Sequence, residues 1–486
     1  MTGVGRNSNS VSLFGGVDWW TVMLYVLLTL IGFAAVFSAS YVEDSKDFFS
    51  FSHEYIKHLV WLGLSYGVAL FILLIDRSTW HKYAYIICAI TLLIVLMTFT
   101  PLGKTVNGAR AWLGLGGFTL QPMELAKVGI SLAVARIMSI YGFSVDRPSD
   151  MFKALCILVI PMGIAVLQND TGSGLVFCSF LFMFYREGLN HWICVPMIFL
   201  VALLILSFLL TPGTLLIALI FIFTFSAGMI MRNRWKICIK YVVGLFFIST
   251  ILFLIFGFAL GRDVNYYNCL LYTTVASMIV VIVYAYRANI RTLYFLIMLF
   301  FVSVICLPTS DLVFHHLKQH QQNRIRTFLG QVDDKDLLYN VNQSKIAIGS
   351  GGFSGKGFLK GSQIRYGFVP EKHTDFIFCT IGEEFGFVGA VILFTCLALL
   401  ILRLMRMGDR QLETFGRVYC YCVASILFFH CLINIGMTMG VVPVMGIPLP
   451  FISYGGSSLL GFSILVFIAI ALDASPTKRQ STLRRW

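Results

Sequence analysis

Charged residues are scarce in this chain of 486 residues. Asp, Glu, Lys and Arg make up 12% of it, whereas hydrophobic residues make up 58%, and the mean hydropathy is +0.84. A water-soluble protein of this length could not bury so much apolar surface and would expose patches too large for it to stay dispersed. The composition therefore excludes a soluble globular protein and predicts a polytopic membrane protein.

Acidic residues are the rarer charge, with 23 Asp and Glu against 36 Lys and Arg, which gives a formal net charge of +13. Such a basic balance also occurs in nucleic-acid-binding proteins. Here, however, the cations gather in short segments between apolar runs, as the orientation signal of a membrane protein does. We therefore expect no nucleic-acid partner.

The twelve cysteines form neither a metal-ligand spacing nor a disulfide framework. They stand singly and mostly inside apolar runs, and Cys420 and Cys422 are too close together for a CxxC motif. We interpret them as small buried apolar residues. No protein-bound metal site is predicted.

Apolar runs of about 20 residues, the length that crosses a bilayer, predict an all-α fold with about fourteen transmembrane helices. The first run is longer than the apolar part of a usual signal peptide, so we expect a retained helix rather than cleavage at residues 38–40. The runs 152–167 and 172–185 are short, and form either two tilted helices or one re-entrant pair. The predicted spans are 19–39, 56–75, 83–99, 123–140, 152–167, 172–185, 191–211, 213–231, 241–260, 267–286, 292–308, 375–402, 415–438 and 457–473.

Lys and Arg are enriched in every second segment between these spans, which predicts that both termini are cytoplasmic. The segment 309–374 is basic although it falls on the outer side, but segments of about 60 residues or more largely escape this rule. No Pro/Ser-rich linker is present. We therefore predict one membrane domain, 1–486, with a cytoplasmic leader at 1–18, a large extracytoplasmic loop at 309–374 and a basic cytoplasmic tail at 474–486.

Asp375 ends a polar, Gly- and Lys-rich stretch, 342–378, at the point where an apolar run begins. Thr374 and Asp375 before such a run are typical of a helix N-cap. The alternative is a carboxylate that faces a substrate at the floor of the external loop. The polar surroundings favour this alternative, and Asp375 is the candidate catalytic residue.

Glu124 and Lys127 begin the fourth span, three residues apart and so on one face of a helix. Pro122 suits the first turn, and Glu124 suits the positive end of the helix dipole. A local ion pair would explain both charges, but a cation inside a span costs about 2.5–3.5 kcal/mol or more and usually faces a polar cavity. Since this span runs from outside to inside, both residues should lie at the depth of Asp375.

Other polar motifs have equally good structural explanations. Arg110 and Trp112 either anchor the chain at the membrane interface or belong to the candidate active site. Asp170 fits a turn as well as it fits a functional site. The sequence GSGGFSGK at 349–356 fails the P-loop pattern because Gly357 follows Lys356. The basic side chains of the large loop either bind phosphate oxygens or lie on anionic headgroups; they are Arg324, Arg326, Lys345, Lys356, Lys360 and Lys372.

Several blocks of the chain closely resemble the SEDS family (shape, elongation, division and sporulation proteins), and within it the rod-shape branch rather than the division branch. The matching blocks are NGARAW at 107–112, QPMELAK at 121–127, QND-G at 168–172, QSKIAIGSGGFSGKGFLKGSQ at 343–363, PEKHTDFIF at 370–378, GEEFGFVG at 382–389 and GIPLPFISYGGSS at 446–458. Three features depart from the family: about four helices at 190–290 are additional to the usual core of about ten, Ala111 stands where many relatives have Arg, and Asn169 replaces the usual Pro.

The resemblance implies a peptidoglycan glycosyltransferase that polymerises lipid II in the bacterial inner membrane, with its site facing outward, during cell elongation. The family's catalytic aspartate falls on Asp375, which we expect to act as general base on the acceptor hydroxyl while a lipid pyrophosphate leaves with inversion. Lys127 and loop cations would stabilise the pyrophosphate. The remaining candidate cavity residues are Glu124, Arg110, Trp112, Gln343, Lys345, Lys356, His373 and Ser453.

The implied partners are a class B penicillin-binding protein, which is the transpeptidase that crosslinks the glycan, and other membrane proteins of the elongation complex. No cofactor is specified by the residues, although a divalent cation, Mg²⁺ or Mn²⁺, is compatible with a pyrophosphate leaving group. Two alternatives come from other classes. A transporter or flippase of lipid-linked precursor would place its site near the midplane between repeats, and no convincing repeat is present; a scaffold would not need Lys127 inside the membrane.

Overall fold

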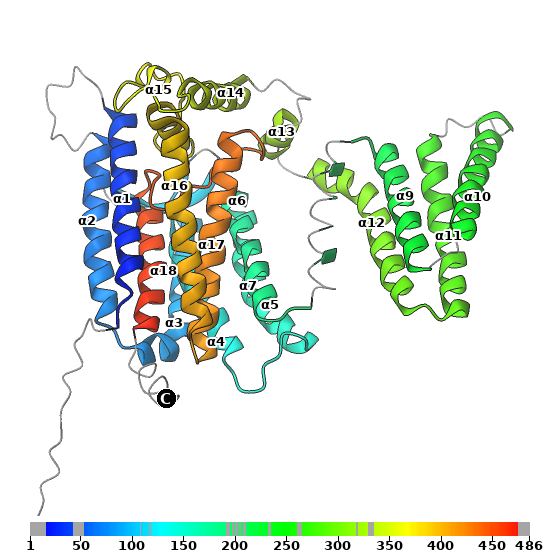
Figure 1. Ribbon diagram of the computed structural model, residues 1–486, viewed down its shortest axis with the longest axis horizontal. Coiled ribbons are helices and arrows are strands. Elements are labelled where there is room, and N and C mark those ends of the chain that lie inside the picture. The colour runs from blue at the N-terminus through cyan, green and yellow to red at the C-terminus, as the bar shows by residue number, and fades with distance from the viewer. Residues whose placement is uncertain are drawn as a thin grey trace, which may run out of the picture. The chain divides into compact units, whose positions relative to one another are not determined.

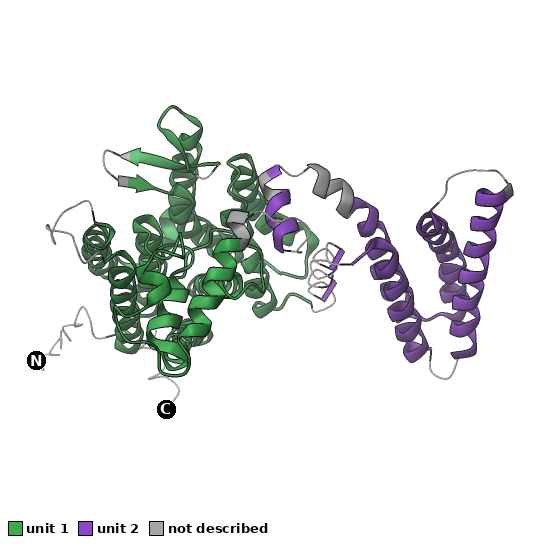
Figure 2. Ribbon diagram, turned by 90° about the horizontal axis from the view of Figure 1, so that it is seen from above, with its two compact units in different colours: residues 1–190, 335–486 green, residues 191–334 purple. Residues whose placement is uncertain are grey.

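The computed structural model describes residues 16–41, 53–106, 108–115, 118–190, 195–196, 199, 203, 206–207, 210–231, 235–259, 265–316, 319–328 and 335–474 (Figure 1). Nearly all of the predicted leader 1–18 and tail 474–486, Asn107 and most of the predicted span 191–211 lie outside these residues. The chain divides into two compact units, residues 1–190 with 335–486 and residues 191–334 (Figure 2). The second unit begins one residue after the predicted start of the additional helices at 190. That the whole chain forms one membrane domain stays a prediction.

Among the described residues, eleven helices are long and apolar enough to cross a membrane, which confirms the mostly helical membrane fold. Seven belong to the first unit: α1 (Trp19–Ser40), α2 (Glu54–Leu73), α3 (Arg77–Leu96, extended by the 3₁₀ turn η1, Met97–Phe99), α5 (Pro148–Leu167), α16 (Ile377–Asp409), α17 (Thr414–Thr438) and α18 (Gly456–Asp473). The count of fourteen stays a prediction. The run 172–185 is divided into α6 (Thr171–Val176), η2 (Phe177–Ser179) and α7 (Phe180–Arg186).

Helix α4 (Pro122–Met138) lies at the centre of the first unit, in contact with α3, α5, α17 and α18. Fourteen of its residues are buried. A three-stranded antiparallel sheet, which the sequence did not predict, precedes it: β1 (Gly103–Val106), β2 (Ala109–Leu115) and β3 (Phe118–Leu120), in the order β1-β2-β3. The sheet delivers the chain to Pro122 in the first turn of α4, so that Glu124 and Lys127 start a buried helix.

The predicted external loop 309–374 contains helical structure. Its first residues continue α12, and three shorter helices follow: α13 (Gln319–Phe328), α14 (Lys335–Ser350) and α15 (Ser362–Arg365). In the first unit, α14 contacts α16 and α17. The Gly-rich residues 351–361 then connect α14 to α15.

The Gly-rich segment docks on a break in α16. Gly386 has φ 61° and ψ −155°, a backbone conformation that is essentially restricted to glycine. The break frees backbone amides that would otherwise bond inside the helix, and Phe387 N donates to Gly352 O at 2.9 Å. In return, Lys356 N donates to Glu383 O at 3.0 Å. The two backbones approach so closely that a Cβ atom on Gly355 would lie 2.1 Å from Glu384 O.

Two buried carboxylates of α16 strengthen this docking. Glu383 accepts hydrogen bonds from Lys356 Nζ at 2.6 Å and from the backbone amides of Gln363 and Ile364 at 3.0 Å each. Glu384 accepts from Ser38 Oγ on α1 and from Leu359 N. Charge-assisted bonds of this kind are the stronger ones in proteins, so the Gly-rich segment is held firmly against the start of α16.

The second unit contains four membrane-length helices: α9 (Pro212–Ile230), α10 (Trp235–Leu254, ending in the π-helical turn Ile255–Ala259), α11 (Tyr266–Ala288) and α12 (Arg291–His316). Neighbouring helices pack on a common apolar core that includes Leu216, Ile220, Leu270 and Val304. Their ends follow ordinary signals: Thr211 caps α9 before Pro212, and Asn289 ends α11 in the left-handed conformation.

We predict that Gly386→Ala destabilises the first unit. The φ and ψ angles alone cost about 1–3 kcal/mol for a residue with a side chain, and the new Cβ would lie 2.3 Å from Gly355 N. The expected result is a lower melting temperature and faster proteolysis within residues 351–361. Gly67→Ala on α2 is the matched control, since a Cβ there meets nothing within 4 Å. Equal stability of the two variants would contradict the docking described above.

Candidate functional site

Lys127 is the centre of a buried polar network. Its side chain is 0% exposed, and its Nζ donates to Glu124 Oε1 at 2.8 Å and lies 2.8 Å from His430 Nε2 on α17. The other ring nitrogen of His430, Nδ1, lies 3.0 Å from the carbonyl oxygen of Pro448. A carbonyl can only accept, so Nδ1 carries the ring proton and Nε2 accepts from Lys127.

The Phe462 ring of α18 completes the enclosure of this ammonium. Lys127 Nζ lies 5.3 Å from the centroid of that ring, a cation–π distance, and the His430 ring meets it edge-on. The predicted ion pair of Glu124 and Lys127 is therefore present, within a larger network than the sequence indicated.

Asn434 lies one helical turn after His430 and connects this network to Asp375. Its Nδ2 donates to the backbone oxygens of Ile447 at 2.7 Å and of Asp375 at 2.9 Å. The half-buried Asp375 also lies beside Gly446, since a Cβ on that glycine would be 3.4 Å from Asp375 Oδ2. Hydrogen bonds thus link α4, α17, the 446–448 turn and the turn before α16. That Glu124, Lys127 and Asp375 act as one site stays a prediction.

Sequence reasoning missed His430 and Asn434. A signal was available, because they are the two strongly polar side chains in the apolar run 418–438 and stand four residues apart, on one helix face. Both are buried, and a polar side chain buried among membrane helices needs a partner.

The N-cap interpretation of Thr374 and Asp375 was wrong. Helix α16 begins at Ile377 with Phe376 in the N-cap position, and no side chain makes a capping bond there. The Thr374 hydroxyl instead donates to Glu371 Oε2 at 2.9 Å. Asp375 thus belongs to the turn before the helix. By contrast, Asp170 is an N-cap, because it accepts from Ser173 N at the start of α6.

His373 lies next to Asp375 in contact with other elements. Its Nε2 is 3.2 Å from Glu54 Oε2 on α2, and its backbone oxygen accepts from Tyr454 N at 2.8 Å. Burial lowers the pKa of the neighbouring Lys372 ammonium and raises the pKa of the Tyr454 hydroxyl. These contacts fix the turn that ends on Asp375.

Two other candidates are engaged in structural bonds. Lys356 forms the ion pair with Glu383 and also donates to Ser350 and Ser362. Ser453 is buried, and its hydroxyl accepts from Leu449 N at 2.8 Å, which closes a turn in the 446–453 segment. Both residues thus stabilise the fold of the segments around the site. Their roles in binding a substrate stay predictions.

Among the described residues, the remaining candidates make no hydrogen bond to the Lys127 network. Arg110 is exposed on β2 and donates to Thr100 O at 3.0 Å, while the half-buried Trp112 pairs with Lys104 in the sheet. Gln343 and Lys345 belong to α14. The Lys345 ammonium lies over Gly440 after the end of α17, where a Cβ on the glycine would meet Nζ at 2.5 Å.

The described residues contain no group of three or more His, Cys, Asp and Glu that could hold a metal ion. A divalent cation, Mg²⁺ or Mn²⁺, in the reaction stays a prediction.

Comparison with known proteins places these residues in a family. The profile of the family FtsW/RodA/SpoVE, described as cell cycle protein, matches residues 18–220 and 214–478. The peptidoglycan glycosyltransferase RodA of Treponema pallidum is 30% identical over 459 residues, which cover 94% of this chain and 97% of RodA. The peptidoglycan glycosyltransferase MrdB of Escherichia coli K12 is 30% identical over 80% of this chain and 77% of its own.

Solved structures share the fold. A chain of a peptidoglycan synthase complex, described as coordinating polymerization and crosslinking, matches 94% of this chain and 97% of its own with a TM-score of 0.61 and 22% identity. The rod shape determining protein RodA of Thermus thermophilus matches 95% of this chain and 97% of its own with a TM-score of 0.54 and 21% identity.

We predict that Lys127→Met is strongly destabilising, by about 3–5 kcal/mol, because it leaves the buried Glu124 carboxylate without its cation. The double variant Glu124→Gln/Lys127→Met should recover most of this loss, since the uncompensated charge is gone. Thermal unfolding of the purified variants measures both effects. A double variant that is as unstable as the single one would mean that the pairing with Glu124 is not what Lys127 contributes.

Proposed function

The chain belongs to the FtsW/RodA/SpoVE family, also known as SEDS, and we propose that it is a peptidoglycan glycosyltransferase that uses Asp375 as its general base. The similarity to RodA and MrdB over most of the chain is the observation that supports glycosyltransferase activity. The substrate that we assign to it is lipid II, a disaccharide peptide linked to a polyprenyl pyrophosphate.

The surroundings of Asp375 support its assignment as the base. It ends a polar external segment, is half-buried, and is held through its backbone by Asn434. Gly446 leaves open the space beside its carboxylate, where any larger residue would place an atom near Oδ2. A fixed, partly exposed carboxylate at the start of a membrane helix can reach a sugar hydroxyl while the lipid tail of the substrate stays in the bilayer.

The reaction follows from this assignment. Asp375 accepts the proton of the acceptor hydroxyl, and the oxygen attacks the anomeric carbon of the donor sugar. The bond from that carbon to the pyrophosphate oxygen breaks, and the electron pair leaves with the polyprenyl pyrophosphate. One displacement inverts the anomeric carbon. Pyrophosphate is a good leaving group without protonation, so a second carboxylic acid is not required, unlike in glycoside hydrolysis.

We assign Lys127 a positioning role. Its ammonium is completely buried between Glu124 and His430, so it acts on the site through His430 and the Pro448 turn. The developing negative charge of pyrophosphate needs exposed cations. Lys345 and Lys360, both exposed in the first unit, are our candidates for that contact.

The partner and the membrane side are also proposals. The structural neighbour described as a peptidoglycan synthase complex supports a class B penicillin-binding protein as partner, with other elongation-complex proteins around it. The alternation of Lys and Arg along the chain supports cytoplasmic termini and a site at the outer face of the bacterial cytoplasmic membrane.

The decisive experiment gives labelled lipid II to the purified protein, with and without the penicillin-binding partner, and separates the products on a gel. We predict a glycan ladder from the wild type and a rate about 10²–10⁴-fold lower from Asp375→Asn, the range that general base catalysis contributes. Glu371→Gln, four residues earlier in the same external segment, is the control and should keep its ladder.

Each other outcome has a definite meaning. A normal ladder from a folded Asp375→Asn variant would keep the enzyme and remove Asp375 as the base. If neither protein gives a ladder but the wild type moves lipid II across a vesicle bilayer, the chain is a transporter of lipid-linked precursor and the glycosyltransferase proposal fails.

A further inference from the structure

The second unit contains an apolar cavity at one end of its helices. The lining residues come from the last part of α9, the first part of α10, the last part of α11 and the start of α12, which an up-and-down arrangement brings together. The volume is about 300 Å³. The lining consists of Phe223, Thr224, Ala227, Met231, Ile237, Cys238, Lys240, Tyr241, Val280, Val281, Tyr284 and Leu293.

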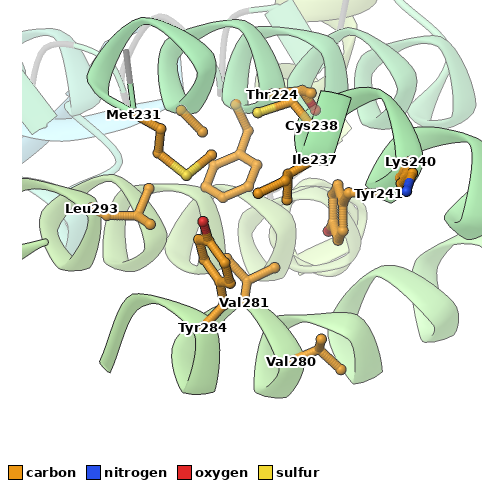
Figure 3. A pocket seen from close by; sticks show the side chains of 12 residues that line it. Thr224, Met231, Ile237, Cys238, Lys240, Tyr241, Val280, Val281, Tyr284 and Leu293 are labelled. Carbon is orange, nitrogen blue, oxygen red and sulfur yellow. The ribbon is translucent and has the colours of Figure 1, made fainter. Parts of the chain in front are cut away.

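The cavity lining is apolar at its centre and has one cation. Figure 3 shows Met231, Ile237 and Tyr284 converging from three helical segments, with Lys240 to one side. Lys240 is exposed, and among the described residues no carboxylate pairs with it. Such a lining suits a molecule with an apolar tail and a negatively charged group.

The sequence around this cavity is basic without acidic compensation. Residues 188–310 contain a single acidic residue, Asp263, which stands between α10 and α11 in the sequence. At the cavity end, the described cations are Lys236, Lys240 and Arg287; in the sequence, Arg232 and Arg234 follow α9, and Arg291 is the first residue of α12. An orientation signal alone would need these charges but would not need a cavity beside them.

We propose that this cavity binds an anionic phospholipid, with one acyl chain among the apolar side chains and the phosphate at Lys240. Basic pockets between membrane helices are known to hold phosphate-bearing headgroups. A volume near the lower end of the range for ligand pockets suits part of one acyl chain better than the long branched chain of a polyprenyl phosphate. None of the candidate catalytic residues lines the cavity, so the site is separate from the proposed polymerase chemistry.

Native mass spectrometry of the delipidated full chain tests this binding without an activity assay. Phosphatidylglycerol and phosphatidylcholine with the same acyl chains are titrated in parallel. We expect one molecule of phosphatidylglycerol to bind with high affinity and phosphatidylcholine to bind more weakly. Lys240→Gln should lower the phosphatidylglycerol affinity about fivefold, the contribution expected of one cation near an anionic headgroup. Lys82→Gln, an exposed cation on α3, is the control and should bind normally.

The apolar part is tested by filling the cavity. Val281→Trp on α11 should abolish tight binding of both lipids, whereas Val283→Trp on the same helix, 46% exposed and outside the lining, should not. Ile237→Trp on α10 is the second filling variant if Val281→Trp does not fold.

Two results would overturn the proposal. Equal binding of the two lipids, unaffected by Lys240→Gln, would mean that the cavity holds ordinary bilayer chains and that the cations serve orientation only. Displacement of phosphatidylglycerol by a lower concentration of polyprenyl phosphate would assign the cavity to the carrier lipid instead.

Discussion

A fully buried ammonium has to be paired, because a membrane interior offers no water to solvate it, and the geometry of the candidate site follows from how Lys127 is paired. Glu124 supplies the negative charge. His430 accepts a hydrogen bond from Lys127 at Nε2, because its ring proton is on Nδ1, which donates to the carbonyl oxygen of Pro448. Helix α4 is thereby tied to α17 and to the 446–448 turn. Asn434, one turn along α17, extends the same face to Asp375. One buried cation thus organises three distant segments of the chain.

The other side of Asp375 is fixed by a different means. Helix α16 starts two residues after it and breaks at Gly386, and the amides released by the break bind the Gly-rich segment. Glu383, with Lys356 and two backbone amides as donors, locks that segment in place. Glycine is required here for close backbone contact rather than for cradling phosphate. Asp375 therefore lies between two rigid attachments, which is the condition for a base to hold its distance from a substrate.

Much of the fold was predictable because membrane spans depend on local composition. Topology alone predicted that Glu124, Lys127 and Asp375 lie at one depth, and the structure links their segments through His430 and Asn434. What failed depended on tertiary contacts. Helix α16 starts two residues after Asp375, which no local pattern gave, and the β-sheet before α4 forms between two spans, where the sequence predicted no secondary structure. Lys356 looked like a phosphate ligand because its partner, Glu383, lies 27 residues further along the chain. His430 was overlooked because a single polar residue in an apolar run gives no partner by itself.

The two units satisfy their charges in opposite ways, and this difference bears on why the chain has additional helices. In the first unit, cations near the ends of the helices have acidic partners from other segments: Arg186 pairs with Asp409, Arg410 with Asp473 and Arg417 with Glu187. Those pairs close the unit on itself. The helices of the second unit have fewer cations but almost no acids in their sequence, so the proposed lipid would supply the missing counter-charge. Membrane phosphate is the anion always present beside such helices. On the proposal made above, the added helices extend the contact of the protein with the lipid rather than its catalytic chemistry.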